Sequence, residues 1–166
     1  ICGDERITYA ALWRRAQTMA GGFKSLGLES TDRVVVQLPN SSEFIIVFVA
    51  LQMLGVIPVL AMCQHRQTEL EYFVRRTEAK ALVIPDVERD FDHRELAREL
   101  SVICPSLQNI VVKGSPFKDQ KSLESLSMHT DTDIGQTSEI DPEEVALLLL
   151  SGGSTGVPKI IPRTHN

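Results

Sequence analysis

The sequence predicts an α/β fold, in which a mostly parallel sheet is flanked by helices on both faces. Short runs of β-branched and aliphatic residues alternate along the chain with stretches whose apolar residues recur at helical spacing. The last of these runs, VALLLL at residues 145–150, contains no polar position. Continuous apolar runs are typical of parallel strands that helices cover on both faces.

Each element follows from local signals. Helices are predicted over residues 8–26, 40–54, 68–77 and 91–100, and strands over residues 33–38, 56–61, 80–84, 109–113 and 145–150. Thr8, Asn40 and Thr68 are the expected N-caps, the last two each with a glutamate three residues later. The apolar run 44–51 predicts a fully buried helix, and Trp13 is expected to pack against the core from the first helix.

The chain is expected to be one partial N-terminal domain over residues 1–166, cut at both ends. No Met opens it, and it stops at Asn166, directly after its strongest motif and where a helix is expected to begin. Between residues 114 and 142 polar residues dominate and hydrophobic periodicity is lost. This stretch is therefore interpreted as a long surface connection.

Composition excludes several classes of protein. The formal charge of −5 argues against a nucleic-acid binder, which shows a basic patch or stripe. Three widely spaced cysteines, Cys2, Cys63 and Cys104, favour neither a disulfide framework nor a zinc site, so a cytoplasmic location is expected. The longest apolar run, 44–51, is far shorter than the ~18 residues of a membrane span, and no membrane partner is expected.

One stretch carries chemistry: SGGSTGVPK, from Ser151 to Lys159, directly after the VALLLL strand. Its glycines allow a tight turn and close approach, its N–H groups can form an anion-binding nest, and its hydroxyls and lysine suit a polyphosphate. The expected phosphate-binding residues are Ser151, Gly152, Gly153, Ser154, Thr155, Gly156 and Lys159. Val157 and Pro158 separate the last glycine from the lysine, so the stretch is not a Walker A loop. The alternative is a flexible turn without a ligand.

The string LLLLSGGSTGVPKIIPRTHN resembles the phosphate-loop motif of the adenylate-forming superfamily. Its extension, KIIPRTHN, is similar to that of aryl-acid ligases of siderophore pathways. The resemblance covers nearly the whole chain, including GDERITYAALWRRAQTMAGGFKSLGL and VVVQLPNSSEFIIVFVALQMLGVIPVLA. One departure is Met62-Cys63-Gln64, where Leu-Pro-Ala or Leu-Pro-Ser is common before His65-Arg66.

The resemblance implies the N-terminal part of the large domain of such an enzyme, and a reaction that uses ATP and Mg²⁺. A substrate carboxylate attacks the α-phosphate, pyrophosphate leaves, and a phosphopantetheine thiol of an aryl carrier protein, or CoA, takes the acyl group. Residues 151–159 would wrap the β- and γ-phosphates. The family's catalytic lysine and its adenine and acid pockets lie beyond Asn166, so no catalytic residue is expected here and the chain alone is expected to be inactive.

Several alternatives stay open at this stage. The acid is expected to be 2,3-dihydroxybenzoate, while a salicylate–AMP ligase, an acyl-CoA ligase or a peptide-synthetase adenylation domain is the alternative within the superfamily. From another class, a non-catalytic nucleotide-binding module is the alternative. His65 and Arg66 either face a cleft or form a surface loop with a structural histidine. The acidic run 86–92 lacks the EF-hand pattern and is interpreted as a solvated loop.

Overall fold

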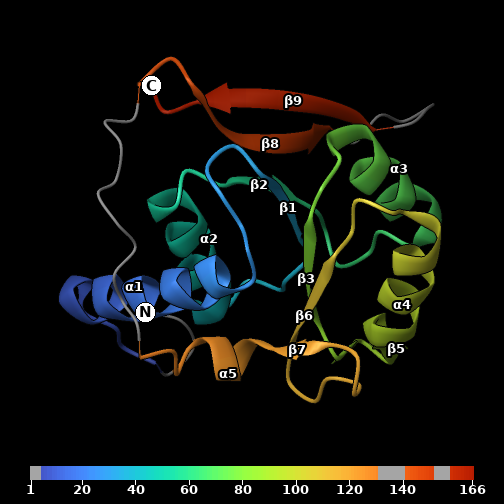
Figure 1. The fold of residues 1–166 in the computed structure, drawn as a ribbon, viewed down its shortest axis with the longest axis horizontal. Helices are drawn as coiled ribbons and strands as arrows, with labels where there is room; N and C mark the ends of the chain where they lie inside the picture. Colours follow the sequence, from blue (N-terminus) through green and yellow to red (C-terminus); the bar gives the residue numbers. More distant parts are fainter. Residues whose placement is uncertain (1–4, 131–140, 152–157) are drawn as a thin grey trace.

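A computed structural model describes residues 5–130, 141–151 and 158–166. Its main sheet has the strand order β7-β6-β3-β1-β2-β8-β9 (Figure 1). The strands are β1 Arg33–Val36, β2 Ile57–Leu60, β3 Ala81–Pro85, β6 Asn109–Lys113, β7 Lys121–Ser122, β8 Val145–Ser151 and β9 Lys159–Thr164, and a separate hairpin pairs β4 Val87–Glu88 with β5 Phe91–Asp92. The helices are α1 Tyr9–Ser25, α2 Ser42–Met53, α3 Gln67–Thr77, α4 His93–Ile103 and α5 Leu123–Leu126.

The predicted fold class is confirmed. Every neighbouring pair from β7 to β8 in the sheet order is parallel, and only β8 and β9 pair antiparallel. The sheet separates two cores, with α1, α2 and α5 on one face and α3 and α4 on the other. Within the central strand β1, Val34 and Val36 pack into the first core and Val35 into the second, because successive side chains of a strand point to opposite faces.

The helix starts differ in part from the predicted caps. Thr8 caps α1 as predicted, since its hydroxyl accepts a hydrogen bond of 3.2 Å from Ala11 N. For α2 the prediction was wrong by one residue: Ser41, not Asn40, is the cap. The predicted box at Thr68 was also wrong, because α3 begins one residue before it.

The start of α3 has a physical reason. Glu69 closes the first turn with a 3.0 Å hydrogen bond to the N–H of Arg66. Glu71, the predicted capping partner, instead binds Arg75 four residues later. The capping contact at the start of α3 therefore joins Arg66 and Glu69, two residues earlier than the predicted pair of Thr68 and Glu71.

The acidic run 86–92 is not a solvated loop but the β4–β5 hairpin, and this prediction was wrong. Its two-residue turn places Arg89 and Asp90 at φ +50° and +63°, values that suit a tight hairpin turn. Asp92 ends the hairpin and caps α4, so that helix starts at His93, two residues later than predicted.

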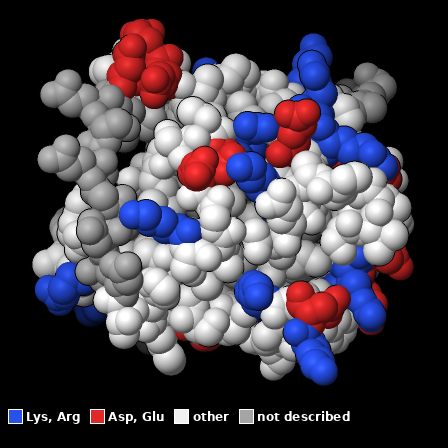
Figure 2. All heavy atoms as spheres, in the orientation of Figure 1, with Lys and Arg blue, Asp and Glu red and all other residues white. Residues whose placement is uncertain are grey.

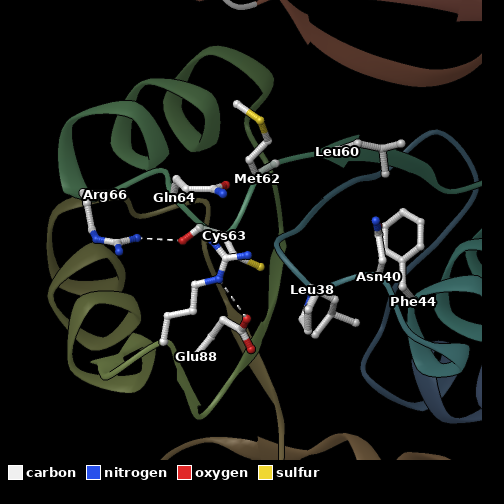
Figure 3. A pocket seen from close by; sticks show the side chains of 12 residues that line it. Leu38, Asn40, Phe44, Leu60, Met62, Cys63, Gln64, Arg66 and Glu88 are labelled. Atoms are coloured by element: carbon white, nitrogen blue, oxygen red, sulfur yellow. Dashed lines mark hydrogen bonds and ion pairs between the residues drawn. The ribbon is translucent and has the colours of Figure 1, made fainter. Parts of the chain in front are cut away.

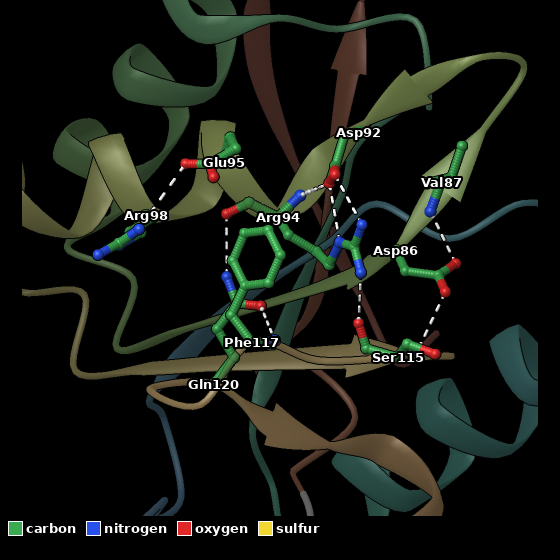
Figure 4. Close-up of polar contacts among 9 residues, drawn as sticks. All are labelled: Asp86, Val87, Asp92, Arg94, Glu95, Arg98, Ser115, Phe117 and Gln120. Carbon is green, nitrogen blue, oxygen red and sulfur yellow. Dashed lines mark hydrogen bonds and ion pairs between the residues drawn. The ribbon is translucent and has the colours of Figure 1, made fainter.

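Polar contacts anchor this hairpin to the loop after β6 (Figure 4). Asp86 accepts a 2.9 Å hydrogen bond from Ser115 N, and Arg94 binds Asp92 as well as the carbonyl of Ser115. Gln120 adds a hydrogen bond to the carbonyl of Arg94. The hairpin, the start of α4 and the chain around residues 115–120 therefore form one connected unit.

The stretch expected to be a surface connection contains regular structure in its first part. Residues 114–130 include β7, which extends the sheet, and α5, whose Leu123 and Leu126 are buried in the first core. Residues 131–140 lie outside the described part of the chain. The short apolar pair three residues apart was too weak a signal to predict α5 from periodicity.

Two burial predictions were wrong. Trp13, near the start of α1, is 56% exposed. On α2 the side chain of Ile45 is 46% exposed, so that helix is not fully buried within the described residues. None of the helices in the described part of the chain has the length and apolar character needed to cross a membrane.

Gly22→Ala is expected to destabilise the protein. A Cβ on Gly22 of α1 would lie 2.6 Å from the carbonyl oxygen of Leu126, a backbone atom that moves only if α5 moves. Alanine favours a helix by about 1 kcal/mol over glycine. Overpacking costs about 1–3 kcal/mol, so we expect a net loss. A lower thermal unfolding midpoint checks this, and a raised midpoint would show that α5 does not pack there.

Candidate functional site at the carboxyl edge of the sheet

The chain leaves β1 and β2 toward opposite faces of the sheet. After β1 it enters α2, beside α1, whereas after β2 it enters α3, beside α4 (Figure 1). In open parallel sheets, adjacent strands whose connections diverge in this way leave a crevice at their carboxyl ends, and ligands bind there. The carboxyl ends of β1 and β2 are therefore the expected place for a site.

A cavity of about 520 Å³ lies at this place. In Figure 3, side chains that follow β1 face side chains that follow β2 across it. Its lining, which we call the edge cavity, consists of Leu38, Pro39, Asn40, Phe44, Leu60, Ala61, Met62, Cys63, Gln64, Arg66, Glu88 and Arg89. The hairpin after β3 supplies the last two residues, so three strand ends meet here.

The turn from Met62 to Arg66 forms one wall of the edge cavity. The side-chain amide of Gln37 donates to the carbonyls of Met62 and His65, at 2.9 and 3.0 Å. His65 is buried, its Nδ1 accepts from Met62 N at 3.1 Å, and its ring packs edge-on against Phe73. The structure thus supports the structural interpretation of His65, while its neighbour Arg66 lines the cavity.

Positive charge dominates this wall. Arg66 donates to the carbonyl of Cys63 at 2.7 Å, and its guanidinium lies 3.9 Å above the ring of Phe91. Arg89 approaches Glu88 at 3.7 Å, so the cavity holds two guanidinium groups and one carboxylate. On the face drawn in Figure 2, acidic and basic side chains are interspersed rather than gathered in one stripe.

The only thiol in the edge cavity lining is not activated. Burial raises the pKa of Cys63, and the nearby carboxylate of Glu88 raises it further, while two arginines act in the opposite direction. A thiol with a raised pKa stays protonated at neutral pH and is a poor nucleophile. The described part of this cavity is therefore suited to binding and positioning rather than to covalent catalysis.

The predicted phosphate loop lies between β8 and β9. Ser151 ends β8 and Lys159 begins β9, and the two are paired across the strands, with Lys159 N donating to Ser151 Oγ at 3.2 Å. Gly152, Gly153, Ser154, Thr155 and Gly156 lie outside the described residues. Because β8 runs parallel to β2 in the sheet, Ser151 comes to the same edge as the edge cavity.

The side chain of Lys159 borders a second, more open cavity of about 640 Å³. Arg33 and Arg76 line the same cavity. Arg33 is engaged by the carbonyl of Thr77 and by Glu78, whereas Arg76 is exposed. Positive side chains thus accompany the lysine at this side of the sheet.

The helix expected at the end of the chain does not include Arg163 and Thr164, which belong to β9. Ile160 and Ile161 are β-branched, and a residue before proline avoids the helical region. Pro162 lacks an N–H and is tolerated because β9 is an edge strand of the sheet. These three residues favour an extended chain.

Sequence reasoning missed most of the edge cavity. Asn40 was marked only as a helix cap, Gln64 only as part of a departure from the family pattern, and Arg89 by no motif. Gln37, which binds the turn 62–66 without lining the cavity, lay in what was interpreted as the end of a strand. The available signal was positional, because all of these residues closely follow strands whose carboxyl ends meet at one edge.

The fold and this edge define an α/β protein with a cavity at the carboxyl ends of its parallel strands. The chain belongs to the AMP-binding enzyme family, whose model matches residues 1–166. It is the N-terminal part of the large domain of such adenylate-forming enzymes, as predicted.

Curated relatives of the chain include enzymes named as aryl acid–AMP ligases. The chain is 44% identical over 99% of its length to a 2,3-dihydroxybenzoate-AMP ligase of Bacillus subtilis (strain 168). It is 40% identical to a salicyl-AMP ligase / salicyl-S-ArCP synthetase of Mycobacterium tuberculosis, again over 99% of the chain. The chain spans about 30% of the length of these relatives. Among solved structures, Mycobacterium smegmatis MbtA in its apo form matches with a TM-score of 0.86 and 41% identity, over 98% of this chain and 29% of that one.

The start of α2 at this edge predicts acid sensitivity. Partial burial alone would raise the pKa of Glu43, but hydrogen bonds from Lys113, from its own backbone and from Ser41 lower it to about 2. A carboxylate with a lowered pKa stabilises the fold above its unfolded value of 4.5, and this contribution is lost as the pH falls from 4.5 toward 2.

Glu43→Gln is therefore expected to lower the thermal midpoint near neutral pH, because Lys113 loses its charged partner. The difference between variant and wild type should shrink as the pH falls below 4.5. Thermal melts of both proteins from pH 7 to pH 3 test this, and a difference that stays constant over that range would contradict the ion pair's contribution.

Proposed function

We propose that the ligase to which this chain belongs activates an aryl carboxylic acid with ATP. The acid's carboxylate oxygen attacks the α-phosphorus, the bond to the β,γ-phosphates breaks, and acyl-adenylate and pyrophosphate form. The single observation that carries the proposal is the SGGSTGVPK loop, which starts at Ser151 on the carboxyl edge of the sheet. Relatives at 44% and 40% identity that are named as aryl acid–AMP ligases give the acid class.

In this proposal residues 151–159 hold the β- and γ-phosphates. The backbone N–H groups of Gly152, Gly153 and Gly156 would bind the phosphate oxygens, and the hydroxyls of Ser151, Ser154 and Thr155 would add donors. Lys159 neutralises charge that grows on the leaving pyrophosphate. The described pairing of Ser151 with Lys159 supports this, because it brings both ends of the loop together.

Mg²⁺ enters this proposal with the nucleotide. Among the described residues no group of three or more histidine, cysteine, aspartate or glutamate side chains is placed to hold a metal ion. Mg²⁺ commonly binds through substrate phosphates and keeps several waters. Bound there, it would share the charge of the triphosphate, while Ser151 and Lys159 orient the phosphates.

The second step passes the acyl group to a thiol. The sulfur attacks the acyl carbonyl, the bond to the phosphate oxygen breaks, and AMP leaves. One relative is named a salicyl-S-ArCP synthetase and another, 42% identical, a 2-hydroxy-7-methoxy-5-methyl-1-naphthoate--CoA ligase. We therefore propose the phosphopantetheine thiol of an aryl carrier protein as the acceptor, with CoA as the alternative, in an enzyme that works in the cytoplasm.

The acid is expected to be 2,3-dihydroxybenzoate, with salicylate second. The two acids differ by one hydroxyl, and a pocket with a partner for that hydroxyl rejects the acid that lacks it. ATP–pyrophosphate exchange by the full-length ligase tests this with 2,3-dihydroxybenzoate, salicylate, benzoate, a fatty acid and an amino acid.

The highest kcat/KM is expected for 2,3-dihydroxybenzoate. A preference for the fatty acid or the amino acid would overturn the aryl-acid assignment, and nucleotide binding without exchange would favour the non-catalytic module. The 166-residue chain alone should show no exchange, because the family's acid pocket lies beyond it.

Loop variants test the phosphate site. Lys159→Ala in the full-length ligase should weaken charge stabilisation by roughly 1–3 kcal/mol, the scale of hydrogen bonds to charged groups. Gly156→Ala should lower turnover because a Cβ obstructs close approach of a phosphate.

Arg163→Ala is the matched control, since it removes an exposed positive charge from the same strand. Exchange kinetics with saturating acid give the comparison. If Lys159→Ala behaves like Arg163→Ala, the loop is not the phosphate site.

A further inference from the structure

Gln37 is a fully buried polar residue that joins three elements at the carboxyl edge. It directly follows β1, and its backbone N–H donates to the carbonyl of Val83 in β3 at 2.8 Å. Its side-chain amide nitrogen donates to the carbonyls of Met62 and His65. Its side-chain oxygen lies 3.1 Å from Nδ1 of His93, the first residue of α4. The amide therefore fastens the turn 62–66 to the rest of the edge.

These contacts determine the state of His93. The Gln37 amide nitrogen donates to two carbonyls, which fixes the orientation of the amide and turns its oxygen toward His93. An amide oxygen can only accept a hydrogen bond. Nδ1 of His93 must therefore carry the proton, which leaves Nε2 bare. This Nε2 is buried and has no hydrogen-bond partner among the described residues. An unpaired buried acceptor costs stability. The contact between His93 Nδ1 and the Gln37 oxygen is therefore formed while Nε2 stays unpaired among the described residues.

The fastened turn stands beside both parts of the candidate site. Met62, Cys63 and Gln64 line the edge cavity directly. Because β2 and β8 are parallel, with Val59 level with Leu148, the turn that follows β2 and Ser151 at the end of β8 lie at the same edge of the sheet. A shift of this turn would therefore move the wall of the edge cavity.

We propose that Gln37 and His93 are positioning residues of the ligase, which fix the turn 62–66, and through it the active edge, by locking the orientation of one buried amide. This inference rests on the proposed function for its activity test but not for its geometry. Neither residue lines the edge cavity, so each acts through the turn rather than on a ligand.

The lock is sensitive to acid. Burial lowers the pKa of His93 below its ordinary value of 6.5, the charge of Arg66 lowers it further, and Glu88 and Asp92 act in the opposite direction. A second proton on the ring would need an acceptor at Nε2, where the described residues offer none. Because the pKa of His93 is lowered in the folded protein, the ring stays neutral there at pH values below 6.5, and the stability of the fold declines as the pH falls below 6.5.

Two substitutions of His93 separate positioning from stability. His93→Asn keeps a donor in the place of Nδ1 at every pH, whereas His93→Leu keeps apolar volume and removes the donor. In His93→Leu the Gln37 side-chain oxygen loses its donor and is left unpaired, so the orientation of the amide is less strongly fixed. Leucine is slightly larger than histidine and asparagine is smaller, so the thermal midpoint of each variant is measured beside its kcat/KM.

The test compares the full-length wild type with both variants in ATP–pyrophosphate exchange between pH 5.5 and 8. At pH 8 we expect His93→Asn to stay close to wild type and His93→Leu to lose about ten- to a hundredfold in kcat/KM, the range that a misplacement of up to about 1 Å costs. Because the pKa of folded His93 lies below 6.5, the thermal midpoint of wild type should fall more between pH 8 and pH 5.5 than that of His93→Asn. Equal kcat/KM in both variants, or losses that follow the thermal midpoints, would overturn the proposal.

A second measurement needs no activity. Cys63 lies in the fastened turn and is half-buried. Its alkylation by iodoacetamide at pH 8, followed by mass spectrometry, should be faster in His93→Leu than in His93→Asn or wild type. If wild type lacks exchange with every acid, the proposed function fails, and the alkylation rates still decide the positioning role. Identical rates in all three proteins would then refute it.

Discussion

The divergence of the chain around β1 is the constraint on which the rest of the structure depends. β1 lies at the centre of the sheet, and its valines are buried on both faces, so each face must be covered by helices. The connection after β1 supplies α2 to one face, and the connection after β2 supplies α3 to the other. Covering both cores with consecutive helices necessarily opens a crevice at the carboxyl ends of these two strands.

That crevice imposes its own requirement on polar groups. The segment that follows a buried strand has backbone carbonyls that are poorly accessible to water, and each of them needs a hydrogen-bond donor. Gln37 satisfies two such carbonyls in the turn 62–66, and Arg66 satisfies another at Cys63. These hydrogen bonds hold the turn that forms one wall of the edge cavity, and Arg66 adds positive charge there. The contacts that satisfy the buried chain thus also shape the cavity.

The sequence was sufficient for what depends on periodicity and on continuous apolar runs. The strand 109–113 was predicted with its observed bounds, and the parallel sheet followed from the alternation of elements. Elements whose stability comes from tertiary contacts escaped prediction: α5 depends on burial of Leu123 and Leu126, and the β4–β5 hairpin on Asp86 and Arg94. Likewise the phosphate loop has a local motif, whereas the edge cavity is assembled from three strand ends that are far apart in the sequence.

The chemistry of the edge fits a reaction in which the substrates supply the reacting groups. In acid activation the nucleophile is the substrate's carboxylate and the leaving group is pyrophosphate, so the protein needs neither an activated thiol nor a general base at this edge. The raised pKa of Cys63 and the structural placement of His65 agree with that requirement. What such a reaction demands is two anionic reactants held close together against their repulsion. The two guanidinium groups of the edge cavity, beside a turn that Gln37 holds by two hydrogen bonds, are suited to that demand, because they add positive charge at the carboxyl ends of the strands.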